Sequence, residues 1–289
     1  MQKNKIVFFT LISLTFITAI YFTLFDTFRI SSGSMADTIL PGDFILSKSY
    51  ESSIKRGRII LFTSPTERDV TYIKRCIALS GDTLEIRDAI VFVNGVEQAS
   101  PPTVKNYYCI SYADDKKTLE TLKQLNILVD EYDETIKTWL TNDEAKVLIS
   151  KPYIESVLPF LRKSNSTQTF FYGNKLPIFL TDSTQNWTLH NYGPIVIPFK
   201  GMSIDPKLSV DNAYLKLIRN QFATWNADSN SIKLNEDFFF KMGDNRDNSI
   251  DSRHFGFIPQ TNIKGSALMI VLSRGPNGVR WERILKHLN

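Results

Sequence analysis

Three segments of this 289-residue chain carry side chains suited to chemistry. Residues 241–258 (KMGDNRDNSIDSRHFGFI) gather aspartate, arginine, asparagine and serine side chains between apolar flanks. Inside a fold, such a segment must satisfy its donors and acceptors within a network, and such networks more often serve function than stability. Two other segments offer reactive groups: a hydroxyl beside a glycine in residues 30–39 (ISSGSMADTI) and a lysine in an apolar frame in residues 72–85 (YIKRCIALSGDTLE).

The serine hydroxyl indicates nucleophilic catalysis, provided that a base lies beside it. A serine is a weak nucleophile until a neighbouring group removes its proton. Histidine is one candidate base, but of His190, His254 and His287 only His254 lies in the polar segment, where a packing role fits equally well. From the residues alone, a Ser-His-Asp triad stays open.

Lys74 is the alternative base, and it must be neutral to accept a proton. Lowering a lysine pKa from about 10.4 to about 8 costs roughly 3 kcal/mol, which burial in an apolar site can supply. On a strand, Lys74 and Arg75 point to opposite faces, so one would face a reaction site and the other a salt-bridge partner. Taken singly, Lys74-Arg75 is more typical of a surface charge pair, and Ser34 after Gly33 of a flexible turn.

The composition is that of a globular protein and excludes several classes. With 43% hydrophobic and 22% charged residues, the chain is neither disordered nor fibrous. Its net charge of +4 is spread along the sequence, which argues against a nucleic-acid surface. The cysteines and histidines lack a metal-ligand spacing, and we expect Cys76 and Cys109 to stay unpaired.

Residues 6–25 predict one transmembrane helix. They contain no charge, and 20 residues at about 1.5 Å each span roughly 30 Å, the thickness of a bilayer's hydrocarbon core. A cleaved signal peptide is the alternative, but its apolar core runs about 7 to 15 residues and ends at a small-x-small site that is missing after Tyr21. Lys3 and Lys5 precede the helix, so the positive-inside rule leaves the N-terminus in the cytoplasm and the remainder outside.

Short runs rich in Ile, Val, Phe and Tyr predict a mainly β fold, an antiparallel barrel or sandwich. Asn94-Gly95 between two such runs predicts a tight type I′ hairpin. Between the β segments, residues 112–163 have a helical character, with a capping box at Thr141 and Glu144. Strand-like runs resume at residues 175–181 and 192–199 and again from Phe238.

These patterns divide the chain into three parts. Residues 1–27 form the cytoplasmic N-terminus and the membrane anchor. Residues 28–105 and 232–289 form a discontinuous β core that holds the three chemical segments. Residues 106–231 form an α/β insertion domain that is helical in its first half.

Taken together, the segments resemble the boxes of bacterial type I signal peptidases (leader peptidases). The matching stretches, which run through residues 1–99 and 236–270, are SGSM at 32–35, GDFILSKSY at 42–50, RGRIILF at 56–62, YIKR and SGD within 72–82, and GDNRDNSIDSRHFG at 243–256. The resemblance implies a membrane-anchored serine endopeptidase that uses a Ser-Lys dyad to remove signal peptides after an Ala-x-Ala site. It also implies a monomer without a cofactor, bound to the bacterial cytoplasmic (inner) membrane with its catalytic domain on the periplasmic side, whose partners are secretory preproteins and the bilayer.

The resemblance also implies roles for matching residues. Ser34 would be the nucleophile and Lys74 the general base, with the Ser32 hydroxyl and the Ser34 backbone N–H forming the oxyanion hole. Ser249 would orient the Lys74 amine. Two further residues and one pair would support the site: Asp251 and Arg253 would hold the strand of Ser249, and Asp244 would pair with Arg75. The walls of the pockets for small substrate residues would be Phe28, Ile30, Met35, Ile39, Tyr72 and Ile73.

Four positions depart from the family's usual residues. These are Ser31, Asp37, Arg58 and Ser80. Asp37 places a carboxylate near the nucleophile, where we expect it to raise the pKa of Lys74 and slow the enzyme at neutral pH. The departures bear on substrate range more than on activity.

Two other functions share part of this pattern. A self-cleaving Ser-Lys protease of the repressor type has the same dyad, but the predicted anchor and the long polar box favour a signal peptidase. A catalytically silent, membrane-tethered binding module would instead act through the insertion domain. Cleavage of a preprotein in trans separates the peptidase from both alternatives.

Overall fold

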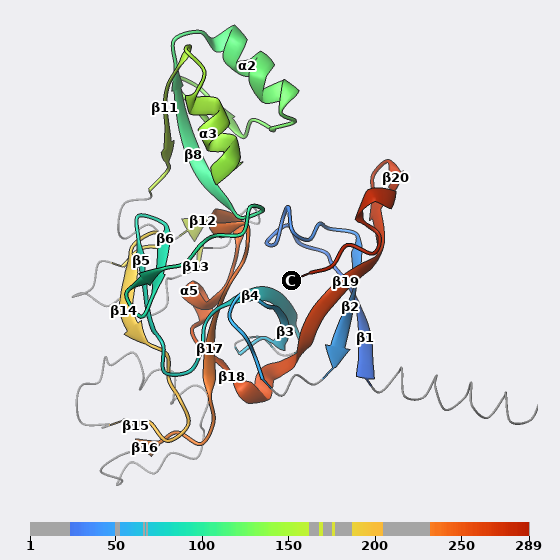
Figure 1. The fold of residues 1–289 in the computed structure, drawn as a ribbon, viewed down its shortest axis with the longest axis vertical. Helices are drawn as coiled ribbons and strands as arrows, with labels where there is room; N and C mark the ends of the chain where they lie inside the picture. Colours follow the sequence, from blue (N-terminus) through green and yellow to red (C-terminus); the bar gives the residue numbers. More distant parts are fainter. Residues whose placement is uncertain are drawn as a thin grey trace, which may run out of the picture.

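The computed structural model describes residues 24–49, 53–65, 67, 69–161, 168–169, 175–176, 187–204 and 232–288 (Figure 1). Most of the predicted transmembrane segment, residues 6–23, lies outside these ranges. Within them, no helix has the length and apolar character needed to cross a bilayer.

One antiparallel sheet forms the centre of the fold. Its strands follow the order β1 (Phe25–Arg29), β2 (Asp43–Ser49), β19 (Ile263–Gly275), β3 (Ile59–Thr63), β4 (Thr71–Ala78), β17 (Phe238–Met242) and β18 (Ile258–Pro259), with β20 (Gly278–Val279) paired to β19. The prediction of a mainly β, antiparallel core is confirmed. The path is open within the described residues, since β1 and β18 pair with different neighbours and not with each other.

Strands distant in sequence meet in this sheet and bring the chemical segments together. Strand β4 carries residues 71–78 between β3 and β17, and β17 leads directly into the polar segment. Residues 73–78 of β4 are all buried, so both faces of this central strand are covered. Ile77 belongs to one apolar cluster with Phe240 and Phe257, and Ile73 to another with Ile39 and Ile59.

A second sheet has the strand order β14 (Tyr192–Val196), β5 (Thr83–Arg87), β6 (Ile90–Val93) and β7 (Val96–Glu97). Asn94 and Gly95 have φ values of 53° and 76°, the left-handed conformation of the predicted hairpin, which is confirmed. Strand β14 pairs with β5, so residues 192–196 belong to the core and not to the insertion domain. The buried side chains of Tyr192 and Ile195, which pack in the core cluster, explain this placement.

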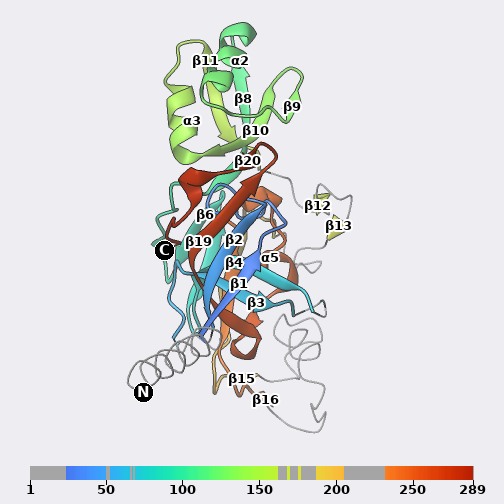
Figure 2. The ribbon, with the colours of Figure 1, turned by 90° about the vertical axis from the view of Figure 1, so that its right-hand side faces the viewer.

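The insertion forms a small α/β unit at the end of the molecule opposite to β15 and β16 (Figures 1 and 2). Its sheet has the order β11 (Ile154–Pro159), β8 (Lys105–Tyr112), β10 (Ile136–Thr141) and β9 (Glu131–Tyr132). Helices α2 (Asp115–Gln124) and α3 (Asn142–Ile149) accompany it, and the Thr141–Glu144 capping box is confirmed. The prediction of a helical first half is wrong in part, because Ile110, Ile136 and Leu140 form a sheet core there.

The remaining elements are short. They are β12 (Gln168–Thr169), β13 (Lys175–Leu176), β15 (Ser203–Ile204), β16 (Ile232–Lys233), α5 (Ser252–Phe255) and the 3-10 turns η1 (Arg246–Asn248), η2 (Gln260–Asn262) and η3 (Trp281–Arg283). The predicted strand at 175–181 lies outside the described residues beyond Leu176. Cys76 and Cys109 are free, as expected.

Candidate active site

Ser34 lies in the loop between β1 and β2, held by packing on one side and by the polar segment on the other. Met35 and Ile39 in this loop are 1% and 0% exposed, and the Ile39 N–H donates to the Met35 carbonyl at 2.8 Å. The Asn245 backbone N–H donates to the Ser34 carbonyl at 3.1 Å. The Asn245 side-chain amide donates to the Gly33 carbonyl at 3.2 Å. The loop therefore presents the Ser34 hydroxyl in a fixed position.

Lys74 reaches this hydroxyl from the central strand β4. Its Nζ lies 2.6 Å from Ser34 Oγ and donates to the Ile73 carbonyl at 3.0 Å. The side chain is 2% exposed. Burial lowers the pKa of Lys74 to about 8, against the opposing charges of Asp251 and Asp244. With a pKa near 8, about a tenth of the Lys74 amines are neutral at pH 7 and able to accept a proton.

The two buried histidines have partners other than Ser34. The ring Nδ1 of His254 accepts from the Asp251 N–H at 3.3 Å and completes the capping box of α5. His190 Nε2 lies 2.6 Å from the Asp247 carboxylate. Burial lowers the pKa of His254 to about 4. Lys74 is thus the base within hydrogen-bonding distance of Ser34. Neither buried histidine forms a hydrogen bond with Ser34, so they do not complete the triad that the sequence left open.

Arg75 points to the other face of β4, where it binds Asp244. The Arg75 Nε donates to Asp244 Oδ1 at 2.8 Å, and its NH2 donates to Oδ2 at 2.6 Å. Thr38 Oγ1 also donates to this carboxylate. The bidentate pair therefore joins β4, the polar segment and the Ser34 loop at a buried position.

A second bidentate pair lies within the polar segment. Arg253 Nε and NH2 each donate to the Asp251 carboxylate at 2.9 Å, and Arg253 NH2 also donates to the Arg246 carbonyl. Although burial opposes ionisation, Arg253 lowers the pKa of Asp251 to about 2. The Gly243 N–H donates to the same carboxylate at 3.0 Å. This pair fixes the turn that follows β17.

The expected hydrogen bond from Ser249 to Lys74 is absent. Within the described residues, the buried Ser249 Oγ has no hydrogen-bond partner. The side chain instead packs against Gly243, where an added Cβ would lie 2.2 Å from Ser249 Oγ and 2.5 Å from the Ser34 carbonyl oxygen. Ile73 contributes the carbonyl that accepts from Lys74 in the place expected for Ser249.

Gly243 and Asn245 belong to the site but were not among the residues predicted from the sequence. Gly243 has no side chain to separate Ser249 from the Ser34 loop, and Asn245 holds that loop by two hydrogen bonds. A glycine at the end of a strand and directly before a polar run is a signal for such a close approach. The partner of Asn245 carries no comparable signal, because backbone carbonyls are present at every position.

The six expected pocket residues divide by exposure. Ile30, Met35, Ile39 and Ile73 are buried in one apolar cluster, and the partly exposed Phe28 packs against it. Tyr72 is also partly exposed but packs in another cluster, stacked on Phe62 at 6.0 Å between ring centroids. Met35 and Ile39, with almost no exposed surface, support the loop from its interior and do not offer a pocket wall.

Ser32 and Asp37 flank Ser34 in the loop. Ser32 is exposed, and its Oγ lies 3.3 Å from Ser34 Oγ. Asp37 binds Lys105 Nζ at 2.7 Å, and the charges that raise the pKa of Lys74 are those of Asp251 and Asp244. The expectation that Asp37 acts on Lys74 is therefore wrong, because its carboxylate is neutralised by a lysine from β8.

One of the remaining departures, Ser80, forms a hydrogen bond within the core. Ser80 Oγ donates to the Phe238 carbonyl at 2.9 Å and so links the turn after β4 to β17. Across the described ranges, no group of three or more His, Cys, Asp or Glu side chains is placed to hold a metal ion.

Comparisons with known proteins point to one family. Residues 3–141 and 200–272 match the family model described as "Signal peptidase, peptidase S26". The chain is 28% identical to the signal peptidase I of Buchnera aphidicola subsp. Acyrthosiphon pisum, over 90% of this chain and 74% of that protein. It is 27% identical to the signal peptidase I of Aquifex aeolicus, over 86% and 76%, and 23% identical to that of Helicobacter pylori strain 26695, over 92% and 87%.

Proposed function

This chain belongs to the signal peptidase family, peptidase S26, and from that premise we propose that it cleaves signal peptides from exported preproteins with Ser34 as nucleophile and Lys74 as general base. Family membership makes the chain a serine peptidase, a hydrolase of peptide bonds. The short distance of 2.6 Å between Lys74 Nζ and Ser34 Oγ is the single observation that carries the assignment of the dyad.

The proposed reaction begins with transfer of the Ser34 proton to neutral Lys74. Ser34 Oγ then attacks the scissile carbonyl, and the lysine returns the proton to the leaving amine as the peptide bond breaks. A water molecule gives a proton to Lys74 and attacks the acyl-enzyme ester; the lysine then returns this proton to Ser34 Oγ as the ester bond breaks and the signal peptide is released. Both steps need an amine that is neutral in part of the molecules, which a pKa of about 8 provides near neutral pH.

The oxyanion of each tetrahedral intermediate needs donors close to Ser34. We assign this role to the Ser34 backbone N–H and to the Ser32 hydroxyl, which lies 3.3 Å from Ser34 Oγ. One such donor typically contributes about 3 to 4 kcal/mol to stabilisation of the transition state. Because Ser32 is exposed, its hydroxyl can turn toward the oxyanion when substrate is bound.

The proposed substrate carries small residues at the first and third positions before the cut, as in Ala-x-Ala. Phe28 and Tyr72 are the expected wall residues with exposed surface, and Ile30 and Ile73 are buried in the cluster against which Phe28 packs. A bilayer anchor at residues 6–25 would hold the enzyme where the apolar segment of a preprotein resides. Because enzyme and preprotein are then held at the same bilayer, the effective concentration of the preprotein at the enzyme is raised. We accordingly place the catalytic domain on the periplasmic side of the bacterial inner membrane.

The test is cleavage of a preprotein with an Ala-x-Ala site by the full chain in detergent micelles. Wild-type protein should release the mature domain, whereas Ser34→Ala and Lys74→Met should release none above background. Lys146→Met is the matched control, since Lys146 is exposed on α3 and pairs with Asp143. Normal processing by Lys74→Met would refute the dyad, and loss of processing in the control would show a general defect.

A further inference from the structure

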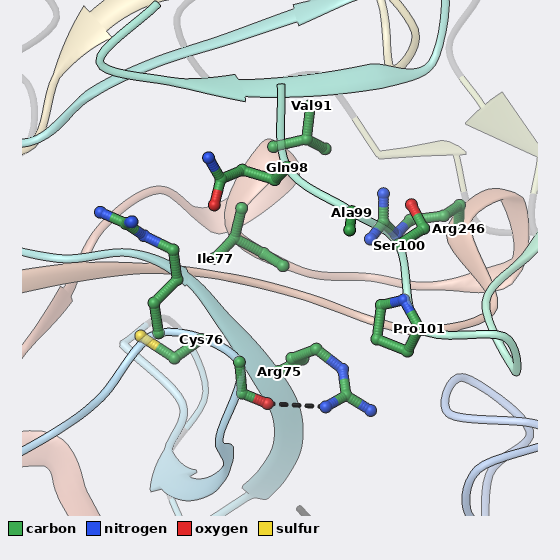
Figure 3. A pocket seen from close by; sticks show the side chains of 11 residues that line it. Arg75, Cys76, Ile77, Val91, Gln98, Ala99, Ser100, Pro101 and Arg246 are labelled. Atoms are coloured by element: carbon green, nitrogen blue, oxygen red, sulfur yellow. Dashed lines mark hydrogen bonds between the residues drawn. The ribbon is translucent and has the colours of Figure 1, made fainter. Parts of the chain in front are cut away.

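A cavity of about 220 Å³ lies beside β4, apart from the dyad. Arg75 and Ile77 of β4, Val91 of β6 and Arg246 of η1 line it, together with residues 98–101 and the Arg56-Gly57 turn (Figure 3). Neither Ser34 nor Lys74 contributes to its wall. The proposed peptidase reaction therefore gives this cavity no role.

Three arginines line the cavity, and two of them have a carboxylate partner. Arg56 NH2 binds the Asp82 carboxylate at 2.7 Å, and Arg75 binds Asp244 through two hydrogen bonds. These carboxylates neutralise the charges of the Arg56 and Arg75 guanidinium groups and fix their positions. The third arginine, Arg246, differs from both.

Arg246 carries a buried charge without a direct counterion among the described residues. It is 4% exposed, and its Nε has no hydrogen-bond partner within them. Across the described part of the chain, its guanidinium forms no ion pair. Burial and the nearby Arg253 lower the pKa of Arg246 to about 10, so the group stays charged at neutral pH. A buried charge without a partner is costly, and an anion in the cavity would offset that cost.

The shape and charge of the cavity narrow the class of anion. Figure 3 shows the Arg246 side chain extending toward Ala99 and Ser100, with Ile77 and Val91 also at the cavity. A planar guanidinium binds carboxylate oxygens in a bidentate manner. One unpaired guanidinium balances one negative charge on a bound anion, and the nearby Asp244 carboxylate disfavours a second negative charge on that anion. The apolar side chains of Ile77 and Val91 suit a short hydrocarbon chain.

We propose that this cavity binds a small organic monocarboxylate, whose carboxylate accepts hydrogen bonds from Arg246 and whose carbon chain packs against Ile77 and Val91. A monocarboxylate bound in the cavity contacts both β4, which carries Lys74, and η1 in the polar segment. The site is therefore a binding site for a small acid behind the catalytic strand, separate from the substrate cleft.

Propionate is the probe for this site. Saturation-transfer NMR at pH 7 measures its binding to the full chain in detergent micelles, with sodium chloride keeping the ionic strength constant. Propionate should bind saturably at one site, and propionamide, which has the same shape without the charge, should not. The absence of saturable propionate binding up to about 100 mM, or equal binding of propionamide, would overturn the proposal. Tighter binding of inorganic phosphate, measured by displacement, would overturn the assignment to monocarboxylates.

Two variants locate the bound acid. Arg246→Met removes the charge, and Ala99→Phe fills the cavity from an exposed position whose replacement leaves the core intact. Arg246→Met should weaken propionate binding by about tenfold or more, because hydrogen bonds to charged groups are among the stronger ones. Ala99→Phe should weaken it by about the same factor, because its ring takes the space of the bound acid. Arg87→Met, at an exposed arginine of β5, should bind as wild type does. If Arg246→Met fails to fold by circular dichroism, Ala99→Phe decides alone, and unchanged binding by it would reject the site.

Discussion

Lys241 should destabilise the protein at neutral pH, and its replacement by methionine should stabilise it. The side chain is 0% exposed on β17, and its Nζ has no hydrogen-bond partner within the described residues. Its nearest aromatic neighbours are Phe62 and Phe239, with Nζ 5.4 Å and 5.2 Å from the ring centroids. Methionine has a similar length, no charge and favourable contacts with aromatic rings.

The magnitude follows from the pKa of Lys241, which burial lowers from 10.5 to about 8. Below pH 8 the folded protein must hold a proton that it binds more weakly than the unfolded chain does. This difference costs about 3 kcal/mol, since one pKa unit corresponds to about 1.4 kcal/mol. As pH rises from 8 to 10.5 the unfolded chain still binds the proton while the folded chain has released it, so the cost shrinks. At pH 10 about 1 kcal/mol remains.

The assay is thermal unfolding of wild type and Lys241→Met in the same detergent and at the same scan rate, at pH 7 and pH 10. At pH 7 the variant should unfold about 6 to 12 °C higher, using about 2 to 4 °C per kcal/mol for a protein of this size. At pH 10 the difference should fall to about a third of that value. Lys146→Met, at an exposed lysine, should match wild type at both pH values. An equal or lower Tm for Lys241→Met at pH 7, or a difference that does not change with pH, would refute the reasoning.

Two further predictions concern the site. Gly243→Ala should lower kcat for a preprotein by about tenfold or more while the circular dichroism spectrum is retained, because the new Cβ would displace Ser249 or the Ser34 loop; wild-type kcat would contradict the close packing. Asp37→Asn should leave the midpoint of the pH profile of kcat/KM within about 0.3 units of wild type, because Asp37 pairs with Lys105 and exposed pairs act weakly. A downward shift of a whole unit would show that Asp37 does act on Lys74.

Local sequence patterns predicted local structure well. The Asn94-Gly95 hairpin and the Thr141–Glu144 capping box depend on neighbouring residues alone, and both are confirmed. Strand β14 was assigned to the wrong part because its pairing with β5 joins residues more than a hundred positions apart. No local pattern specifies a partner at that distance, and burial of Tyr192 and Ile195 decides it.

In the candidate site too, local patterns predicted some contacts and missed those that depend on distant residues. Alternation along a strand predicted that Lys74 and Arg75 face opposite sides, and they bind Ser34 and Asp244 respectively. The hydrogen bond expected for Ser249 is absent, because that serine packs against Gly243. Contacts of this kind depend on differences of about 1 Å between backbones, which residue types do not encode.

The pH dependence of kcat/KM tests the central claim, that buried Lys74 is the base for Ser34, most directly. It should be measured in the Lys241→Met background, so that the other buried lysine with a pKa of about 8 does not contribute. The account predicts that kcat/KM rises about tenfold per pH unit below a midpoint near 8 and then levels off, and that Lys74→Met abolishes cleavage at every pH. A midpoint near 6.5, the value of an ordinary histidine, or cleavage by Lys74→Met, would contradict it.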